Sequence, residues 1–315
     1  MYVRAPFQRK PSPSTSPRRW PSTSRRGTAV RILRLAEEAR AFSRSARAGG
    51  ETVALVPTMG YLHEGHLSLV RLARRRASRV MATIFVNPLQ FGPREDLSRY
   101  PRDFDRDRSL LEREGVDALF APEVEEMYPA GACTRVVVEG PLTEGLCGAR
   151  RPGHFAGVAT VVAKLFALSE PDVAVFGQKD AQQAAVIRRM TRDLNLPVEI
   201  VVAPIVREAD GLAMSSRNVY LNAEERSQAV VLSQALASAQ ASFETGERRT
   251  AALLEIARRV IASAPLARLD YAEIVDAETF LPAEQVSSPS LLALAVHFGS
   301  TRLIDNTVLQ PDREA

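Results

Sequence analysis

Residues 53–67 read VALVPTMGYLHEGHL: an apolar run stops at Pro-Thr-Met-Gly, and His-x-Gly-His then opens an amphipathic segment that continues to Arg76. This order predicts a buried strand, a tight turn and the start of a helix. Glycine allows close backbone approach at the turn, and the first amides of a helix are unpaired, so the junction can receive an anion such as phosphate. His63 and His66 share a helix face and can reach one ligand, with Gly65 leaving room between the rings.

The chain on either side of this junction alternates helices and strands as far as residue 206. Apolar residues at helical spacing predict helices over 29–48, 103–114 and 156–168 and after Asp180. Short apolar runs predict strands over 52–57, 80–86, 118–120, 135–139, 172–176 and 198–206. Such alternation indicates an α/β fold with a parallel sheet, which binds ligands at the carboxyl ends of its strands.

The pattern changes after residue 206. Two helical segments, 223–242 and 248–263, are followed by strand-like runs at 269–276, 291–298 and 302–309. Strands without intervening helices predict a small antiparallel sheet. We therefore expect a leader over 1–28, an α/β domain over 29–205, and a smaller α+β domain over 206–315 that carries a polar glycine-containing loop at 206–218.

Composition limits the class of protein. With 315 residues and 45% apolar side chains, the chain can bury a substantial core. No apolar run reaches the roughly 18 to 20 residues that span a bilayer, so no membrane partner is expected. The net charge of +4 is concentrated at the start, since residues 1–36 contain no Asp or Glu.

The leader, residues 1–28, is rich in Ser, Pro and Arg and is predicted to be disordered. It is open to three interpretations: a dispensable start, a transit peptide, or a tail that contacts nucleic acid. The slightly acidic remainder argues against nucleic acid as a partner. Cys133 and Cys147 lie 14 apart without a second pair, which matches neither a zinc site nor a disulfide framework, so free thiols in the cytoplasm are expected.

Lysine is rare here: the chain has 38 Arg but only three Lys, at positions 10, 164 and 179. Lys179 follows a predicted strand, where a compact ammonium suits phosphate oxygens, although an ordinary surface lysine remains possible. Lys164 is expected to extend its ammonium from an apolar helix face to water. Ser215-Ser216-Arg217 either caps a turn or wraps a triphosphate.

The sequence gives little indication of a protein-bound metal or of a catalytic nucleophile. His-x-Gly-His lacks the Glu offset of a zinc helix, so no protein-bound metal is expected there. Asp105 and Asp107 are expected to be a solvated helix start, although a carboxylate near phosphates could hold Mg²⁺. No Walker loop, GxSxG or kinase signature is present. Cations, hydroxyls and helix amides around a polyphosphate instead indicate nucleotidyl transfer, in which charge on departing pyrophosphate is stabilised without a protein nucleophile.

Five motifs together resemble the pantothenate synthetase (pantoate–beta-alanine ligase) family. They are PTMGYLHEGH at 57–66, FVNPLQF at 85–91, HFAGV at 154–158, FGQKD at 176–180 and GLAMSSRN at 211–218. The resemblance covers roughly residues 30–310. It implies a Rossmann-like domain of the HIGH-motif nucleotidyltransferase superfamily, a homodimer, and a ligase that uses ATP, carried with Mg²⁺, to join pantoate and β-alanine through pantoyl adenylate, releasing AMP and pyrophosphate.

The resemblance also implies site residues. ATP contacts are implied at Met59, Gly60, Tyr61, Leu62, His63, Glu64, Gly65, His66, Gly177, Gln178, Lys179, Asp180, Val206, Met214, Ser215, Ser216 and Arg217. Among them, the chemistry is assigned to His66, His63, Lys179, Ser215 and Arg217. The pantoate and β-alanine side is implied at Gln90, Gln183, Asn87, Tyr100 and Arg151. For His66, implied as a general acid, charge stabilisation is the favoured role because departing pyrophosphate hardly needs a proton.

Two alternative functions remain at this stage. One is a nucleotidyltransferase that stops after nucleotidyl transfer and is indifferent to β-alanine. The other is a nucleic-acid-binding protein that uses residues 1–28, with salt-sensitive binding lost when this leader is removed.

Overall fold

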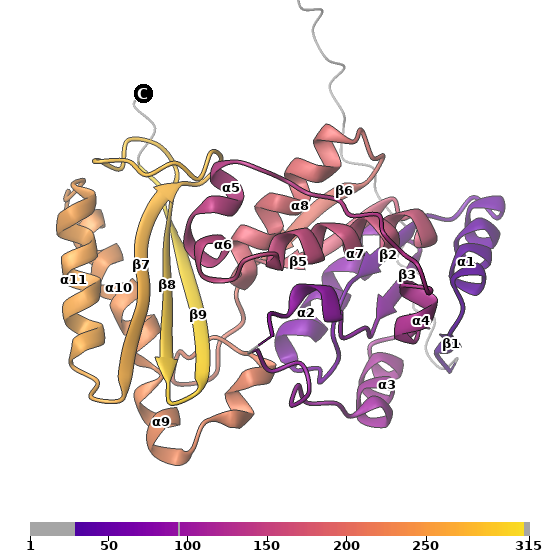
Figure 1. Cartoon of the computed structure of the whole chain (residues 1–315), viewed down its shortest axis with the longest axis horizontal. Coiled ribbons are helices and arrows are strands. Elements are labelled where there is room, and N and C mark those ends of the chain that lie inside the picture. The colour runs from indigo at the N-terminus through magenta and orange to yellow at the C-terminus, as the bar shows by residue number, and fades with distance from the viewer. Residues whose placement is uncertain (1–28, 94, 312–315) are drawn as a thin grey trace, which may run out of the picture.

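A computed structural model describes residues 29–93 and 95–311 (Figure 1). The predicted leader, residues 1–28, lies outside the described residues. Within those residues, no helix combines the length and apolar character needed to cross a membrane.

Six parallel strands form the larger sheet. They are β1 (Arg31–Leu33), β2 (Val53–Val56), β3 (Arg79–Thr83), β4 (Ala118–Phe120), β5 (Val173–Gly177) and β6 (Glu199–Ala203). Their spatial order is β1-β4-β3-β2-β5-β6, with every neighbouring pair parallel. The chain runs outward from β2 to β4 and then returns to place β5 on the other side of β2. The order of strands therefore reverses between β2 and β5, the position at which open α/β sheets bind ligands.

Helices cover both faces of this sheet. Buried residues of α1 (Ala36–Ala48), α7 (His154–Ser169) and α8 (Ala181–Asp193) pack on one face with Leu55 and Phe176. On the other face, α2 (Glu64–Arg76) and α3 (Phe104–Arg113) pack with Val56 and Val175. Both sides of the central strands β2 and β5 are thus buried, as their continuous apolar sequences require. Three short helices, α4 (Val124–Met127), α5 (Pro141–Glu144) and α6 (Leu146–Arg150), and the 3-10 turn η1 (Pro88–Gln90) lie in the connections.

The second sheet is antiparallel and contains β7 (Ala267–Asp276), β8 (Ser290–Phe298) and β9 (Thr301–Leu309) in that order. Helices α10 (Val231–Glu244) and α11 (Thr250–Ala262) pack on its outer face, at the left of Figure 1, and α9 (Ala223–Gln228) precedes them. Its inner face packs Tyr271 and Leu291 against Leu146 and Phe155 of the first part of the chain. These contacts fix the antiparallel sheet beside the carboxyl edge of the parallel one.

The predicted α/β class, with a smaller α+β part, is confirmed. Three local predictions were wrong. The predicted helix over 29–48 starts only at Ala36, because Arg31–Leu33 pairs with β4 as a short edge strand. Residues 135–139 pair with no strand among those described; instead the Val136 amide donates to Thr160 Oγ1. The predicted helix over 223–242 is two helices, α9 and α10.

Candidate active site

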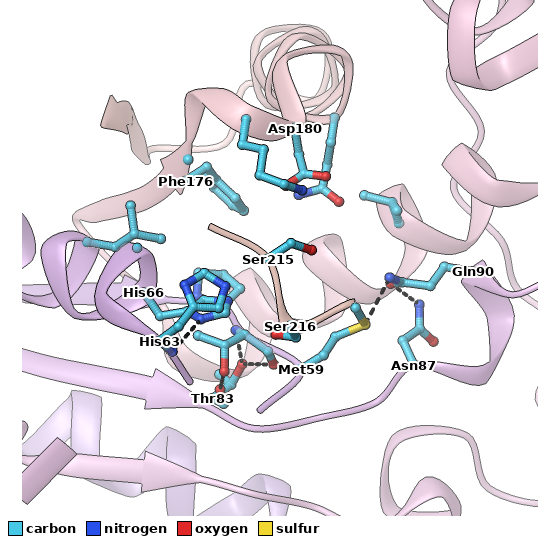
Figure 2. Close-up of a pocket in the computed structure, with 18 of the residues that line it drawn as sticks. Met59, His63, His66, Thr83, Asn87, Gln90, Phe176, Asp180, Ser215 and Ser216 are labelled. Atoms are coloured by element: carbon cyan, nitrogen blue, oxygen red, sulfur yellow. Dashed lines mark hydrogen bonds and ion pairs between the residues drawn. The ribbon is translucent and has the colours of Figure 1, made fainter. Parts of the chain in front are cut away.

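One cavity of about 210 Å³ opens where strand order reverses, at the carboxyl ends of β2 and β5 (Figure 2). Segments far apart in the sequence line it. They are the turn after β2, the first residues of α2, the η1 turn, α7, the 3-10 turn η2 (Gln178–Asp180) and the loop before the 3-10 turn η3 (Ser216–Tyr220). The cavity therefore lies at the carboxyl ends of the parallel strands, where the sequence led us to expect a ligand site.

The turn after β2 is shaped by a buried carboxylate. Gly60 has φ +86° and Tyr61 has φ +50°, backbone conformations that a side chain disfavours. The Asp107 carboxylate, on α3, accepts hydrogen bonds from the amides of Tyr61 at 2.6 Å and Leu62 at 2.8 Å. Burial raises the pKa of Asp107, against the opposing effect of these amides. The expectation of a solvated Asp107 is wrong: only 1% of it is exposed, whereas the Asp105 side chain is 87% exposed.

The two histidines lie side by side at the start of α2. His63 is the residue before the helix, and its amide donates to His66 Nδ1 at 3.3 Å. The ring centroids are 4.1 Å apart, and a Cβ on Gly65 would lie 2.9 Å from the His63 ring, so a larger residue there would displace that ring. Burial, with Lys179 nearby, lowers the pKa of His63 to about 4. Burial also lowers the pKa of His66, assisted by His63 and Lys179. Both rings are therefore neutral at pH 7.

A hydrogen-bond chain orients the Gln90 side chain. Its Nε2 donates to Met59 Sδ at 3.1 Å, and its Oε1 accepts from Asn87 Nδ2 at 3.1 Å (Figure 2). Asn87 Nδ2 also donates to the Gly157 carbonyl, while its Oδ1 accepts from the Leu89 amide and the Tyr128 hydroxyl. Asn87 thus makes four hydrogen bonds, two as donor and two as acceptor, which is the full capacity of a carboxamide. Asn87 therefore lines the cavity but holds Gln90 in place.

His154 and Arg151 fix the backbone of the same turn. His154 Nδ1 lies 2.8 Å from the Gln90 carbonyl, and Arg151 Nη1 lies 2.9 Å from His154 Nε2. Because a guanidinium can only donate, Nε2 accepts and Nδ1 carries the proton. Burial and the Arg151 charge lower the pKa of His154 to about 4, consistent with this neutral form. Arg151 also forms a two-point pair with Glu95, at 2.8 and 2.6 Å.

Lys179 enters the cavity from η2, directly after β5. Its Nζ lies 3.9 Å from Asp180 Oδ2, a long contact, and 21% of its side chain is exposed. Lys164, in contrast, lies with its Nζ 5.6 Å from the centre of the Tyr128 ring. The rare lysine of the FGQKD motif is thus a cation held loosely at the cavity.

The Ser215–Arg217 loop is tied to two neighbouring loops. Ser216 Oγ donates to the Tyr61 carbonyl at 3.1 Å. Arg217 donates to both carboxylate oxygens of Asp96, each at 2.9 Å, and its guanidinium stacks over Tyr100. Burial alone would raise the pKa of Asp96, but Arg217 holds it below its ordinary value. Arg217 is therefore already paired with a carboxylate, which the sequence did not predict.

The cavity gathers most of the site residues expected from the sequence. Those that line it are Met59, His63, Gly65, His66, Asn87, Gln90, Tyr100, Arg151, Gly177, Lys179, Asp180, Gln183, Val206, Met214, Ser215, Ser216 and Arg217. Five others lie outside its lining: Gly60, Tyr61, Leu62, Glu64 and Gln178. Leu62 is in the core, Glu64 pairs with Arg71, and Gln178 bonds Asn306.

Sequence reasoning missed some residues that shape the cavity. His154 stands in one of the five motifs without an expected role, and Glu95 and Asp96 lie in a loop where no pairing is expected. A histidine that follows Arg-Pro-Gly at a helix start is the available signal for His154. Nothing local marks Asp96, because its partner Arg217 is 121 residues away.

The fold and the cavity define a nucleotide-binding α/β enzyme: a parallel sheet with paired imidazoles, an ammonium and serine hydroxyls around one cavity at its switch point. Comparison with known proteins narrows this class. The family model of pantoate-beta-alanine ligase matches residues 31–308, and the chain belongs to that family.

Individual relatives agree with this assignment. Pantothenate synthetase of Heliobacterium modesticaldum is 59% identical over 281 residues, covering 89% of this chain and 100% of the relative. The crystal structure of pantothenate synthetase from Thermus thermophilus has a TM-score of 0.86 at 52% identity, covering 90% of this chain and 100% of the other. The Francisella tularensis pantoate-beta-alanine ligase, complexed with beta-gamma ATP and beta-alanine, has a TM-score of 0.75 at 30% identity, covering 89% of this chain and 98% of the other.

Proposed function

We propose that this chain condenses pantoate with β-alanine in two steps that share the cavity. In the first, a pantoate carboxylate oxygen attacks the α-phosphorus of ATP, forming pantoyl adenylate and releasing pyrophosphate. In the second, the β-alanine amine attacks the acyl carbon, the bond to the phosphate oxygen breaks, and AMP leaves as the amine loses a proton. The observation that supports this most is that residues from all five family motifs line one cavity.

Stabilisation of negative charge is the proposed contribution to the first step. Lys179 places an ammonium against the phosphates, where it acts on the charge that builds on pyrophosphate. His66 accepts a hydrogen bond at Nδ1, so in its neutral form Nε2 carries the proton and can donate to a phosphate oxygen. Since the pKa of His63 is lowered to about 4, hydrogen bonding by neutral imidazoles is a better proposal than proton donation by imidazolium.

On the acyl side of the reaction, the proposed contribution of the protein is to position the substrates. Gln90 and Gln183 would bind pantoate through carboxamides, which both donate and accept. Gln90 is pre-oriented by Asn87, so Asn87 acts through it. Asp180 is proposed to meet the ribose, Val206 the adenine, and Ser215 and Ser216 the phosphates. Holding the amine next to the adenylate can lower the activation free energy by several kcal/mol, about 7 or more in the best cases.

Magnesium is proposed to arrive with ATP. Among residues 29–93 and 95–311, no three His, Cys, Asp or Glu side chains gather as a metal site. The donor set of the cavity is instead an ammonium, hydroxyls and imidazoles with the single carboxylate of Asp180, which suits phosphate oxygens. The phosphates would then supply most of the oxygen ligands that Mg²⁺ prefers.

A homodimer is also proposed. Val137 (58% exposed), Leu194 (51%) and Leu281 (50%) lie along one groove between the extended segment 136–138, α8 and the loop after β7. An extended segment without a strand partner among the described residues can pair with the same segment of a second copy, which gives a two-fold interface. Exposed apolar side chains beside it favour burial on association.

Three further assignments are proposed with it. The two parts of the chain divide near residue 206, since β6 ends at Ala203 and the second sheet follows. His63-x-Gly65-His66 at a helix start favours membership of the HIGH-motif nucleotidyltransferase superfamily. A cytoplasmic location agrees with the free thiols of Cys133 and Cys147.

One experiment separates this function from its alternatives. Purified protein is incubated with ATP, Mg²⁺ and pantoate, with and without β-alanine, and AMP, pyrophosphate and pantothenate are measured. Stoichiometric AMP and pantothenate only with β-alanine support the ligase; indifference to β-alanine indicates a nucleotidyltransferase that stops early. Lys179→Ala is expected to lower pantoate-dependent ATP–pyrophosphate exchange about 100-fold. Full exchange in this variant would remove Lys179 from the mechanism.

A further inference from the structure

A contact between the two sheets bears on Lys179. Strand β9 carries two neighbouring buried polar residues, Asp305 (2% exposed) and Asn306 (4% exposed). As neighbours in a strand they point to opposite faces of the sheet, and both side chains are buried. Buried polar groups are costly unless they are hydrogen-bonded, so their partners show what they hold.

Asn306 makes three hydrogen bonds to the turn that carries Lys179. Its Nδ2 donates to the carbonyl of Gln178 at 3.0 Å and to the carbonyl of Lys179 at 2.9 Å. Its Oδ1 accepts from Gln178 Nε2 at 3.0 Å. The side chain thereby fixes two consecutive peptide groups of η2. The lysine ammonium itself, by contrast, is held only by the 3.9 Å contact with Asp180 within the described part of the chain.

Asp305 holds the other active-site loop. Its carboxylate forms a two-point pair with Arg207, at 2.6 and 3.1 Å, and its Oδ1 also accepts from the Asn306 amide at 2.8 Å. Arg207 follows Val206 and also donates to the Gly211 carbonyl at 3.0 Å. Adjacent residues of β9 therefore hold the loops on both sides of the cavity.

We propose that Asn306 is a positioning residue for adenylate formation: by fixing the backbone of η2 to β9, it sets where the Lys179 ammonium meets the phosphates. This inference rests on the proposed role of Lys179 at the phosphates. A flexible lysine side chain can be only as well placed as its backbone, and misplacement of about 1 Å can cost on the order of 100-fold in rate. Asn306 touches no reacting atom and acts only through the turn.

The test is a double-mutant cycle in pantoate-dependent ATP–pyrophosphate exchange. Asn306→Leu keeps the size of the side chain and removes all three bonds; Asn306→Asp keeps the shape but turns a carboxylate oxygen toward two carbonyls. Both are combined with Lys179→Ala. Thr307→Leu is the matched control, since it lies next in the same strand and points to the opposite face. Thermal unfolding and circular dichroism are recorded for every variant.

We expect each Asn306 variant to lower kcat/KM for ATP at least tenfold when Lys179 is present and less than twofold in the Lys179→Ala background. Thr307→Leu should change it less than twofold in both. Equal losses in both backgrounds, or no loss with Lys179 present, would overturn the proposal. If Asn306→Leu does not fold, the isosteric Asn306→Asp decides by the same criteria. Full activity of Lys179→Ala would instead refute the role of Lys179 in the proposed function.

Discussion

Gly157→Ala tests how the cavity positions Gln90, because α7 touches the η1 turn at this glycine. A Cβ added at Gly157 would lie 2.2 Å from the Leu89 carbonyl oxygen, 2.4 Å from its carbon and 2.7 Å from the Gln90 amide nitrogen. All three contacts are with backbone, so no side-chain rotation can relieve them. The turn itself must move away from the helix.

The size of that movement follows from the distances. Ordinary contact begins at 3.4 Å, so the Leu89 carbonyl must retreat by roughly 1.2 Å. The bond from Asn87 Nδ2 to the Gly157 carbonyl, 3.1 Å long, is strained at the same time. A displacement of this size can cost on the order of 100-fold in rate. Overpacking lowers the free energy of unfolding by about 1–3 kcal/mol, and the higher helix propensity of Ala over Gly offsets roughly 1 kcal/mol of this loss.

Pantoate-dependent ATP–pyrophosphate exchange measures the effect. We expect kcat/KM for pantoate to fall about 100-fold, while ATP binding measured by calorimetry stays close to that of the unsubstituted protein. Gly299→Ala is the control, since Gly299 has φ +54° in the turn between β8 and β9 and does not line the cavity. Unchanged pantoate kinetics, or an equal loss for both substrates, would refute the reasoning.

Three other predictions concern the ionisation of two histidines, the buried Asp107 and the proposed dimer interface. Because the pKa values of His63 and His154 are lowered to about 4, the unfolded chain binds more protons than the folded chain between pH 6.5 and 4. Denaturant unfolding should therefore show that each group lowers the free energy of unfolding by about 2 kcal/mol between pH 7 and pH 5. His154→Gln should lessen this loss. Asp107→Asn sets an N–H against the turn amides, so urea unfolding should show a loss of about 2 kcal/mol and exchange activity should fall. Val137→Asp should shift sedimentation toward the monomer, and unchanged sedimentation would contradict the proposed interface.

The sequence predicts well what depends on neighbouring residues. The junction at 53–67 is a strand, a turn and a helix because its apolar run, glycines and helical periodicity are all local signals. Lys179 stands out because lysine is rare in this chain, and it lies at the cavity. The strands of the second sheet are also predicted closely, since they are three strand-like segments with no helical segment between them.

Prediction failed where a residue's role depends on a distant partner. Asp107 looks like a solvated helix start until α3 brings its carboxylate to amides 46 and 45 residues away. Asn306 stands in an ordinary strand sequence, and its partners lie 128 and 127 residues earlier. The edge strand β1 is only three residues long and has the composition of a helix start, so only its pairing with β4 distinguishes it.

The cations that line the cavity differ in how tightly a carboxylate already binds them. Arg217 is bound at two points to Asp96, and Arg151 at two points to Glu95. A triphosphate that recruits Arg217 must first break a half-buried pair. That change leaves the Asp96 carboxylate without its partner, which is unfavourable unless residues 95–100 move as well. Lys179, whose carboxylate contact within residues 29–93 and 95–311 is the 3.9 Å one to Asp180, needs no such exchange. We therefore predict that Lys179 meets the phosphates first and that any contact from Arg217 is coupled to movement of the segment that carries Asp96.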